Sequence, residues 1–318
     1  MTVDAVSSNS AVVARASAPH PKARGGRPRL SRRTRQRLLG LAYAAPALAL
    51  FTAIVLVPLV KSMVYSGYQW DGVSEPTFVG FDNYVNFFAD PDLRDSLVHV
   101  LVLVVFFALL PSALGLVTAG LLGRERVAGD GAFRVILFLP QVLTSIVVAI
   151  VWGRVLGPDG PLNTVLRAVG LDILAINWLG DFTWALPALG LIGSWTNFGL
   201  CLVLFLSGMG TIPKERYEAA RLDGAGPLGE FRAVTLPGLR THLTVALTLT
   251  ITGALRTFDL VWNTTRGGPG SATTTPALML YRFAFKDPQI GQASAIGIVT
   301  AVFCLLVALF LSRMAEQR

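Results

Sequence analysis

The residues of this chain whose types and spacing could do chemistry are concentrated in a charged segment from Gly210 to Arg240. Pro213 suits the first turn of a helix, and good helix formers follow it from Lys214 to Leu222. A run rich in Gly and Pro then breaks the pattern, and a second short helix is predicted from about Leu228 to Val234, ended by Pro237. Two helices this short cannot cross a bilayer. The sequence therefore predicts that they form a rigid, amphipathic protrusion at a membrane surface.

Seven residues of this segment stand in a fixed order and spacing: Glu218, Ala219, Ala220, Gly224, Val234, Leu236 and Pro237. The pattern resembles the EAA loop of the permeases of ATP-driven (ABC) importers, where Ile is more usual at the position of Val234. The resemblance implies that the segment is a coupling helix seated in a cleft of a separate ATPase. The coupling residues it implies are Glu218, Ala219, Ala220, Asp223, Gly224, Ala225, Leu236 and Pro237.

Further segments resemble the carbohydrate-uptake branch of these permeases. They are the stretch from Phe78 to Phe88, Gly160 to Asn163, Trp195 ahead of the charged segment, and Phe258, Asp259, Thr265, Gly267, Gly268 and Pro269. The resemblance implies a type I importer with a second permease, two cytoplasmic ATPase subunits, an external solute-binding protein and a sugar as substrate. No cofactor is expected in this chain, and ATP and Mg²⁺ would bind the partner ATPase.

The composition of the chain is that of a membrane protein. Of its 318 residues 53% are hydrophobic and 14% are charged, and the mean hydropathy is +0.59. Six stretches are long and apolar enough to span a bilayer. They are Leu39 to Val60, Leu97 to Leu122, Val135 to Trp152, Ala185 to Met209, Leu243 to Trp262 and Ala293 to Leu311. The predicted fold is therefore an all-α membrane protein with six transmembrane helices in residues 39–312.

The distribution of charge predicts the orientation. With the N-terminus inside, nineteen of the 27 Lys and Arg residues fall on inner segments and six on outer segments. Both termini, residues 1–38 and 313–318, are thus expected in the cytoplasm. Residues 1–38 are basic and poor in large apolar residues, which predicts a disordered tail that attracts anionic lipid rather than nucleic acid.

Polar residues inside the spans are candidates for a path that binds sugar hydroxyls. They are Gln141, Thr144, Ser145, Ser194, Trp195, Thr196 and Asn197, together with the charged Arg256 and Asp259. Hydroxyl and amide side chains also commonly hold membrane helices together, so both interpretations stay open. Arg256 and Asp259, three residues apart on one predicted helix, could either pair with each other or contact the solute.

The sequence favours neither catalysis nor metal binding. It has no P-loop motif, and Cys201 and Cys304 lie in apolar runs without ligand-like neighbours. We therefore expect a transporter subunit that is not itself an enzyme and binds no metal. Glycerol 3-phosphate or another small solute is an alternative cargo, although no basic cluster lies in the spans. An ion-coupled secondary carrier is the alternative mechanism, with Asp259 as its sole support.

Overall fold

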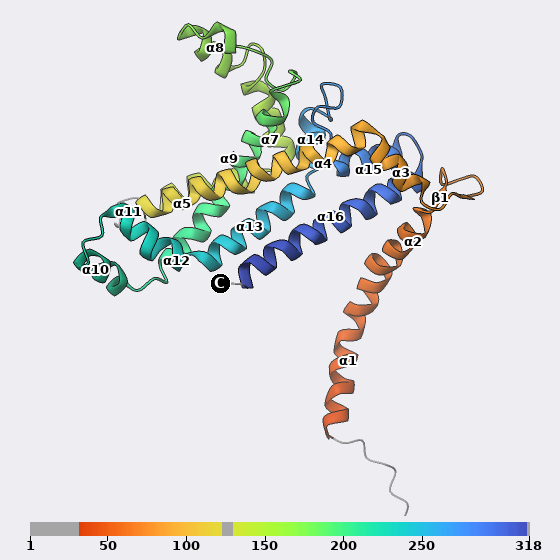
Figure 1. Cartoon of the computed structure of the whole chain (residues 1–318), viewed down its shortest axis with the longest axis horizontal. Coiled ribbons are helices and arrows are strands. Elements are labelled where there is room, and N and C mark those ends of the chain that lie inside the picture. Colours follow the sequence, from red (N-terminus) through yellow and green to blue (C-terminus); the bar gives the residue numbers. More distant parts are fainter. Residues whose placement is uncertain (1–31, 123–129, 317–318) are drawn as a thin grey trace, which may run out of the picture. The chain divides into compact units, whose positions relative to one another are not determined.

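The computed structural model describes residues 32–122 and 130–316, and these residues are mainly helical (Figure 1). One short antiparallel ribbon, β1 (Tyr68–Gln69) paired with β2 (Thr77–Phe78), departs from the predicted all-α fold. The α-helices are α1 (Arg32–Phe51), α2 (Val57–Tyr65), α3 (Asp82–Ala89), α4 (Pro91–Val104), α5 (Leu110–Leu122), α6 (Asp130–Val142), α7 (Ser145–Val155), α8 (Pro161–Ala168), α9 (Ala185–Met209), α10 (Lys214–Leu222), α11 (Pro227–Glu230), α12 (Leu236–Gly238), α13 (Arg240–Leu255), α14 (Asp259–Thr264), α15 (Pro276–Phe285) and α16 (Ile290–Glu316).

The chain divides into two units, Met1–Val57 and Pro58–Arg318. The described part of the first unit is α1 and the turn that follows it. Helix α1 begins at Arg32, so residues 32–38, predicted as part of a disordered tail, are helical. Arg and Gln are good helix formers, which explains the earlier start. Residues 1–31 of the predicted tail lie outside the described residues, and the predicted C-terminal tail is helical as far as Glu316.

Four helical stretches are long and apolar enough to cross a membrane: Ala42–Tyr65, Pro91–Leu121, Ala185–Met209 and Ile290–Phe310. They correspond to the first, second, fourth and sixth predicted spans. The third predicted span is a bent pair, because α6 and α7 meet at an angle of 106°. The described residues thus contain four unbroken candidate spans, or five if the bent pair counts as one.

The fifth predicted span, Leu243 to Trp262, is not one helix. Helix α13 ends at Leu255 and α14 begins at Asp259. A residue from another segment stabilises the break, because the Thr275 hydroxyl donates a 3.1 Å hydrogen bond to the Thr257 carbonyl oxygen. A polar partner thereby satisfies a backbone group that the interrupted helix leaves open. Hydropathy contains no trace of this contact, which explains why a continuous span was predicted.

Three of the prolines within the described helical stretches closely follow a π-helical turn. The residue before each of Pro58, Pro111 and Pro237 donates its N–H group to the carbonyl five residues earlier, which forms the π-helical turns Thr52–Leu56, Val105–Leu109 and Phe231–Thr235. A proline ring collides with the carbonyl four residues before it, and the wider turn moves that carbonyl aside. The helix therefore continues beyond the proline.

Helix α9 is the central element of the second unit and packs against α4, α5, α6 and α13. One buried cluster around it contains Phe107, Leu189 and Ile192, and a second contains Ala119, Phe205 and Val234. The Ser194 hydroxyl of α9 donates a 2.6 Å hydrogen bond to the Phe106 carbonyl oxygen. Apolar packing and an interhelical hydrogen bond together fix the bundle on which the functional segments are mounted.

Helices α4 and α5 form one continuous helical stretch, Pro91–Leu121, and its two ends carry different structures. At the α4 end, Leu93 packs with Phe87, Met279 and Ile296, which come from α3, α15 and α16. At the α5 end, Ala119 shares a cluster with Val234 of the charged segment. This stretch of 31 residues is roughly 45 Å long. The charged segment and the α3–α15 region thus lie at opposite ends of a helix of membrane length (Figure 1).

Candidate functional site

The segment from 210 to 240, here called the EAA-like loop, begins with α10, whose bounds match the predicted Lys214–Leu222. Three backbone hydrogen bonds close the helix, and the last runs from the Ala225 N–H group to the Ala220 carbonyl oxygen at 2.9 Å. Gly224 takes a φ of +83°, the left-handed conformation that reverses the chain after a helix. A side chain at this position is strained, so the glycine is required by the turn.

The second helical part of the EAA-like loop is longer than predicted. It runs through α11, the π turn Phe231–Thr235 and α12, and so continues to Gly238. The prediction that Pro237 ends this helix is wrong, because the π turn accommodates the proline. Helix α13 then begins at Arg240, so the loop leads almost directly into the membrane part of the chain.

Two side-chain contacts fasten the halves of the loop together. The Arg221 Nε–H group donates to Glu230 Oε1 at 3.0 Å, and the hydroxyls of Tyr217 and Thr235 lie 3.1 Å apart. The Glu230 carboxylate is buried, and its hydrogen bond and charge raise the pKa of Arg221 above the ordinary value. Arg221 therefore stays charged at any physiological pH, and the clamp between α10 and α11 persists.

The base of the loop is apolar and buried. Ile212, Val234 and Leu239 belong to the same cluster as Phe205 and Met209 at the end of α9. Ala220 and Tyr217 pack against this cluster from α10. A displacement of the loop therefore reaches α9 and α13 through close-packed side chains, which are hard to compress.

The outer face of the loop is a mixed polar and apolar surface. Among the residues predicted to couple, Glu218, Ala219, Asp223, Gly224 and Pro237 are exposed, whereas Ala220, Ala225 and Leu236 are half-buried. Leu222 and Leu228, on either side of the glycine turn, are 89% and 62% exposed. The sequence interpretation did not single out these leucines, although apolar residues beside a turn in a charged segment indicate a surface that contacts a partner.

The polar residues predicted for a solute path are brought together only in part. Gln141 and Thr144 lie at the break between α6 and α7, and both are exposed. Arg256 and Asp259 lie at the break between α13 and α14 and are exposed as well. Since α7 packs against α14, the two broken helices are neighbours in the bundle.

Arg256 and Asp259 do not form an ion pair within the part of the chain that the structure describes. The expectation that they share a helix face is wrong, because Arg256 caps the end of α13 and Asp259 opens α14. A cation at a helix C-terminus and an anion at a helix N-terminus each interact favourably with the local dipole. Each charge is therefore stabilised by its own helix and remains exposed.

The candidates on α9 differ among themselves. Ser194 is buried and binds two carbonyl oxygens, and Asn197 donates to the Gly193 carbonyl oxygen at 2.9 Å. Trp195 is 37% exposed, and its ring packs edge-on against Trp152 of α7 with centroids 5.4 Å apart. Ser194 is thus engaged in packing, whereas Trp195 packs against α7 and leaves part of its aromatic surface exposed.

A model of the family described as "binding-protein-dependent transport system inner membrane component" matches residues 112–318, which include α9, the EAA-like loop and both helix breaks. The chain belongs to this family. Its predicted resemblance to an importer permease is thereby confirmed, and a membrane location follows from the same match together with the apolar helices.

Two relatives show how far the similarity of this permease extends. It is 35% identical over 270 residues to the probable ABC transporter permease protein YurN of Bacillus subtilis. The aligned region covers 84% of this chain and 92% of the relative. It is 35% identical over 303 residues to the diacetylchitobiose uptake system permease protein NgcF of Streptomyces coelicolor, covering 91% and 86%. The similarity therefore extends over nearly the whole permease.

The fold is also similar to that of a chain in the crystal structure of a bacterial ABC transporter involved in the import of the acidic polysaccharide alginate. The TM-score is 0.76 at 22% identity, covering 89% of this permease and 96% of that chain. At this identity the match supports the fold alone. It shows that the overall fold of this chain is one already seen in a solved transporter structure.

Proposed function

We propose that this chain is the permease subunit of an ATP-driven importer that takes up a neutral sugar or oligosaccharide. It pairs with a second permease to form the pathway, receives its solute from an external binding protein, and is driven by two cytoplasmic ATPase subunits. The observation that carries the proposal is the EAA-like loop, a clamped pair of helices with an exposed glycine turn and a buried base on α9. ATP and Mg²⁺ belong to the ATPase partner in this scheme.

The exposed face of the loop suits a protein partner. Leu222 and Leu228 offer apolar surface, Glu218 offers a negative charge, and Ala219 allows the partner to approach closely. A cleft on the ATPase that buries the leucines would exclude water from the contact and secure the loop. Closure of the two ATPases would then push the loop and rotate the helices packed on its base.

We further propose six spans with both termini in the cytoplasm. The fifth span in chain order is the pair α13 and α14, counted together across the break at Arg256, and the other five are the four unbroken helices and the bent pair α6–α7. The excess of Lys and Arg on one set of loops supports this orientation. It places the EAA-like loop inside the cell and the α3–α15 end outside.

The identity of the solute class rests on relatives of this permease. Besides the diacetylchitobiose system, these include the lactose transport system permease protein LacF, 28% identical over 282 residues, and the trehalose/maltose transport system permease protein MalF, 31% identical over 273 residues. All three names refer to neutral oligosaccharides. The exposed amide, hydroxyl and indole groups at the helix breaks can hydrogen-bond and pack against such a solute.

The coupling role is tested by two substitutions on the exposed face, Glu218→Lys and Leu222→Asp. Both should abolish import of radiolabelled diacetylchitobiose, lactose or maltose, whichever the wild-type cells take up, while the permease remains in the membrane in normal amount. Asp159→Lys is the matched control, since its side chain is 97% exposed and lies between α7 and α8, away from the loop. Normal import by both loop variants would refute the coupling assignment.

The orientation is tested by chemical labelling in a background in which Cys201 and Cys304 are replaced by Ala. A cysteine at Leu228 should react with a membrane-impermeant maleimide only in inside-out vesicles, prepared from cells that lack the ATPase subunits so that the loop is uncovered. A cysteine at Val73, which is 93% exposed in the β1–β2 loop, should react only in intact spheroplasts. Labelling of both from the same side would overturn the proposed topology.

A further inference from the structure

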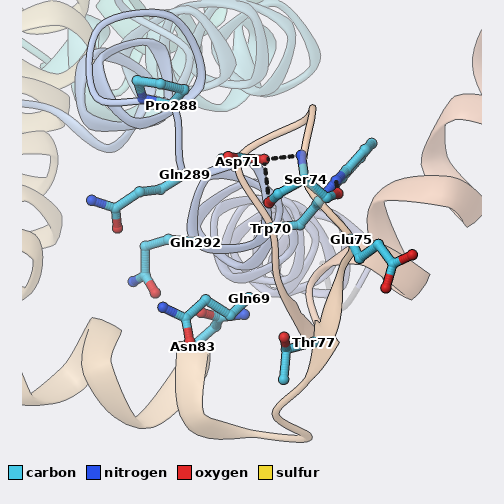
Figure 2. A pocket seen from close by; sticks show the side chains of 10 residues that line it. All are labelled: Gln69, Trp70, Asp71, Ser74, Glu75, Thr77, Asn83, Pro288, Gln289 and Gln292. Carbon is cyan, nitrogen blue, oxygen red and sulfur yellow. Dashed lines mark hydrogen bonds between the residues drawn. The ribbon is translucent and has the colours of Figure 1, made fainter.

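A pocket of about 560 Å³ lies at the end of the bundle opposite the EAA-like loop, and none of the residues predicted for coupling or for the solute path lines it. Figure 2 shows the ten side chains around it, which come from the β1–β2 ribbon and its loop, from α3, from the segment just before α16, and from the first turn of α16. Its volume is within the range of small-molecule sites. A second, smaller cavity shares Gln289 and Gln292 with it, so the two adjoin at these amides.

The pocket is held open by close contacts in its walls. The Gly291 N–H group donates to the Trp70 carbonyl oxygen at 3.3 Å, and a side chain at Gly291 would overlap the Tyr68 carbonyl oxygen. The Asn83 side chain donates to the carbonyl oxygens of Ser66 and Tyr68, both at 2.9 Å. The ribbon is therefore tied to α3 and to the start of α16, and the pocket is a preformed feature of the fold.

One lining group points to a ligand. Gln292 is only 7% exposed, and within the described residues its amide Nε2 has no hydrogen-bond partner. A buried polar donor without a partner is costly, about 1–3 kcal/mol for a neutral group. In Figure 2 the side chain of Gln292 lies beside those of Gln289, Gln69 and Asn83, on one side of the pocket. A ligand that accepts a hydrogen bond there would satisfy this donor.

The charge of the pocket selects the kind of ligand. Asp71 and Glu75 line it, and its lining residues among those the structure describes include no Lys, Arg or His. The N–H groups of Val73 and Ser74 bind the Asp71 carboxylate and lower its pKa, so it stays ionised. The carboxylates disfavour an anion, whereas amide groups can both donate to and accept from hydroxyls. Trp70 adds aromatic surface.

We propose that this pocket is a binding site for a neutral saccharide at the end of the permease opposite the coupling loop. The side chain of Gln292 donates to a sugar oxygen, and carboxylate and amide oxygens of the rim accept from its hydroxyls. The site is separate from the helix breaks and does not depend on ATP-driven coupling. It would hold a sugar at the mouth of the pathway, outside the membrane core.

The test measures binding without transport. The full-length permease, with the subunits that co-purify with it, is placed in lipid nanodiscs without ATP and without the external binding protein. Saturation-transfer NMR is then recorded with diacetylchitobiose, lactose and maltose as probes and with glucose 6-phosphate as the anionic comparison. At least one disaccharide should receive saturation, and glucose 6-phosphate should receive less.

Three variants locate the signal. Gln292→Leu removes the buried donor and should weaken binding roughly tenfold. Thr77→Trp fills the pocket from its exposed rim and should remove binding, and it leaves the buried groups untouched. Val73→Trp introduces the same side chain in the loop that leads into β2, at a position that does not line the pocket, and should bind as wild type. Absence of saturation with all three disaccharides, an equal signal with glucose 6-phosphate, or undiminished binding by Thr77→Trp would overturn the proposal.

Discussion

The EAA-like loop and the two helix breaks are both interruptions of helical structure, yet they treat their polar groups in opposite ways. In the loop, Arg221 is bound to Glu230 and Tyr217 to Thr235. At the breaks, Gln141, Thr144, Arg256 and Asp259 are exposed, and no ion pair joins the last two within the described residues. The loop is built as a unit, whereas the breaks leave polar groups available.

This difference fits two different tasks. A segment that receives force must transmit displacement without deforming, and internal bonds and a buried base provide this stiffness. A segment that contacts a moving solute must offer groups that are not already satisfied by the protein. Pairing of polar side chains thus distinguishes the two regions better than hydropathy or charge does, and substitutions can challenge the distinction.

Among the substitutions that test this contrast between the loop and the breaks, the largest effect is expected at the glycine turn. Gly224→Val places a branched side chain at a φ of +83°, at a cost of about 1–2 kcal/mol or more, and should reorient α10 relative to α11. Import should fall at least about tenfold, with the permease still present in the membrane. Gly226→Ala is the matched control, because Gly226 has a φ of −74° and open space around it. Equal import by the two variants would contradict a rigid loop.

The next largest effect is expected at the clamp. Arg221→Gln and Glu230→Gln should each lower the Tm of the purified permease, and the double variant should lower it by clearly less than the two together, because the first change already breaks the bond. Import should decline in all three variants, since the two halves of the loop are no longer held together. Additive losses of Tm would show that the two residues act independently.

The outline of the fold could be predicted from the sequence, but the details of the breaks could not. The bounds of α10 were predicted because Pro213, a run of helix formers and Gly224 are local signals. The break after Leu255 depends on Thr275, and the continuation past Pro237 depends on a π turn, neither of which has a local signature. An apolar stretch indicates that a segment lies in the membrane, not that it forms a single helix.

The candidate sites divide in the same way. Spacing within one segment indicated the EAA-like loop, whereas the saccharide pocket was missed entirely. Its residues come from 69–83 and 288–292, segments more than 200 residues apart, and only the folded ribbon brings them together. The polar residues of the spans were found, but their partners were not, so Ser194 and Trp195 could not be told apart before their contacts were known.

A smaller effect is expected at the break between α13 and α14. Arg256→Gln and Asp259→Asn should change the stability of the permease additively, within about 0.5 kcal/mol, because the two side chains are not paired. Each should nevertheless reduce import, since each removes an exposed charge beside the proposed path. Exchange of the charges in an Arg256→Asp, Asp259→Arg variant should not restore import. Recovery of import or strong non-additivity would mean that the two residues pair during the transport cycle.

The smallest effect is expected on α9. Ser194→Ala removes the hydrogen bond to the Phe106 carbonyl oxygen and should destabilise the permease by about 0.5–1 kcal/mol, seen as a small decrease in Tm with nearly normal import. Thr196→Val is the control, because within the described residues the Thr196 hydroxyl donates to the Gly193 carbonyl oxygen of its own helix, and its loss should change Tm less. A Ser194→Ala variant with unchanged Tm and reduced import would place Ser194 on the solute path, and the contrast between packed and available polar groups would then fail at this residue.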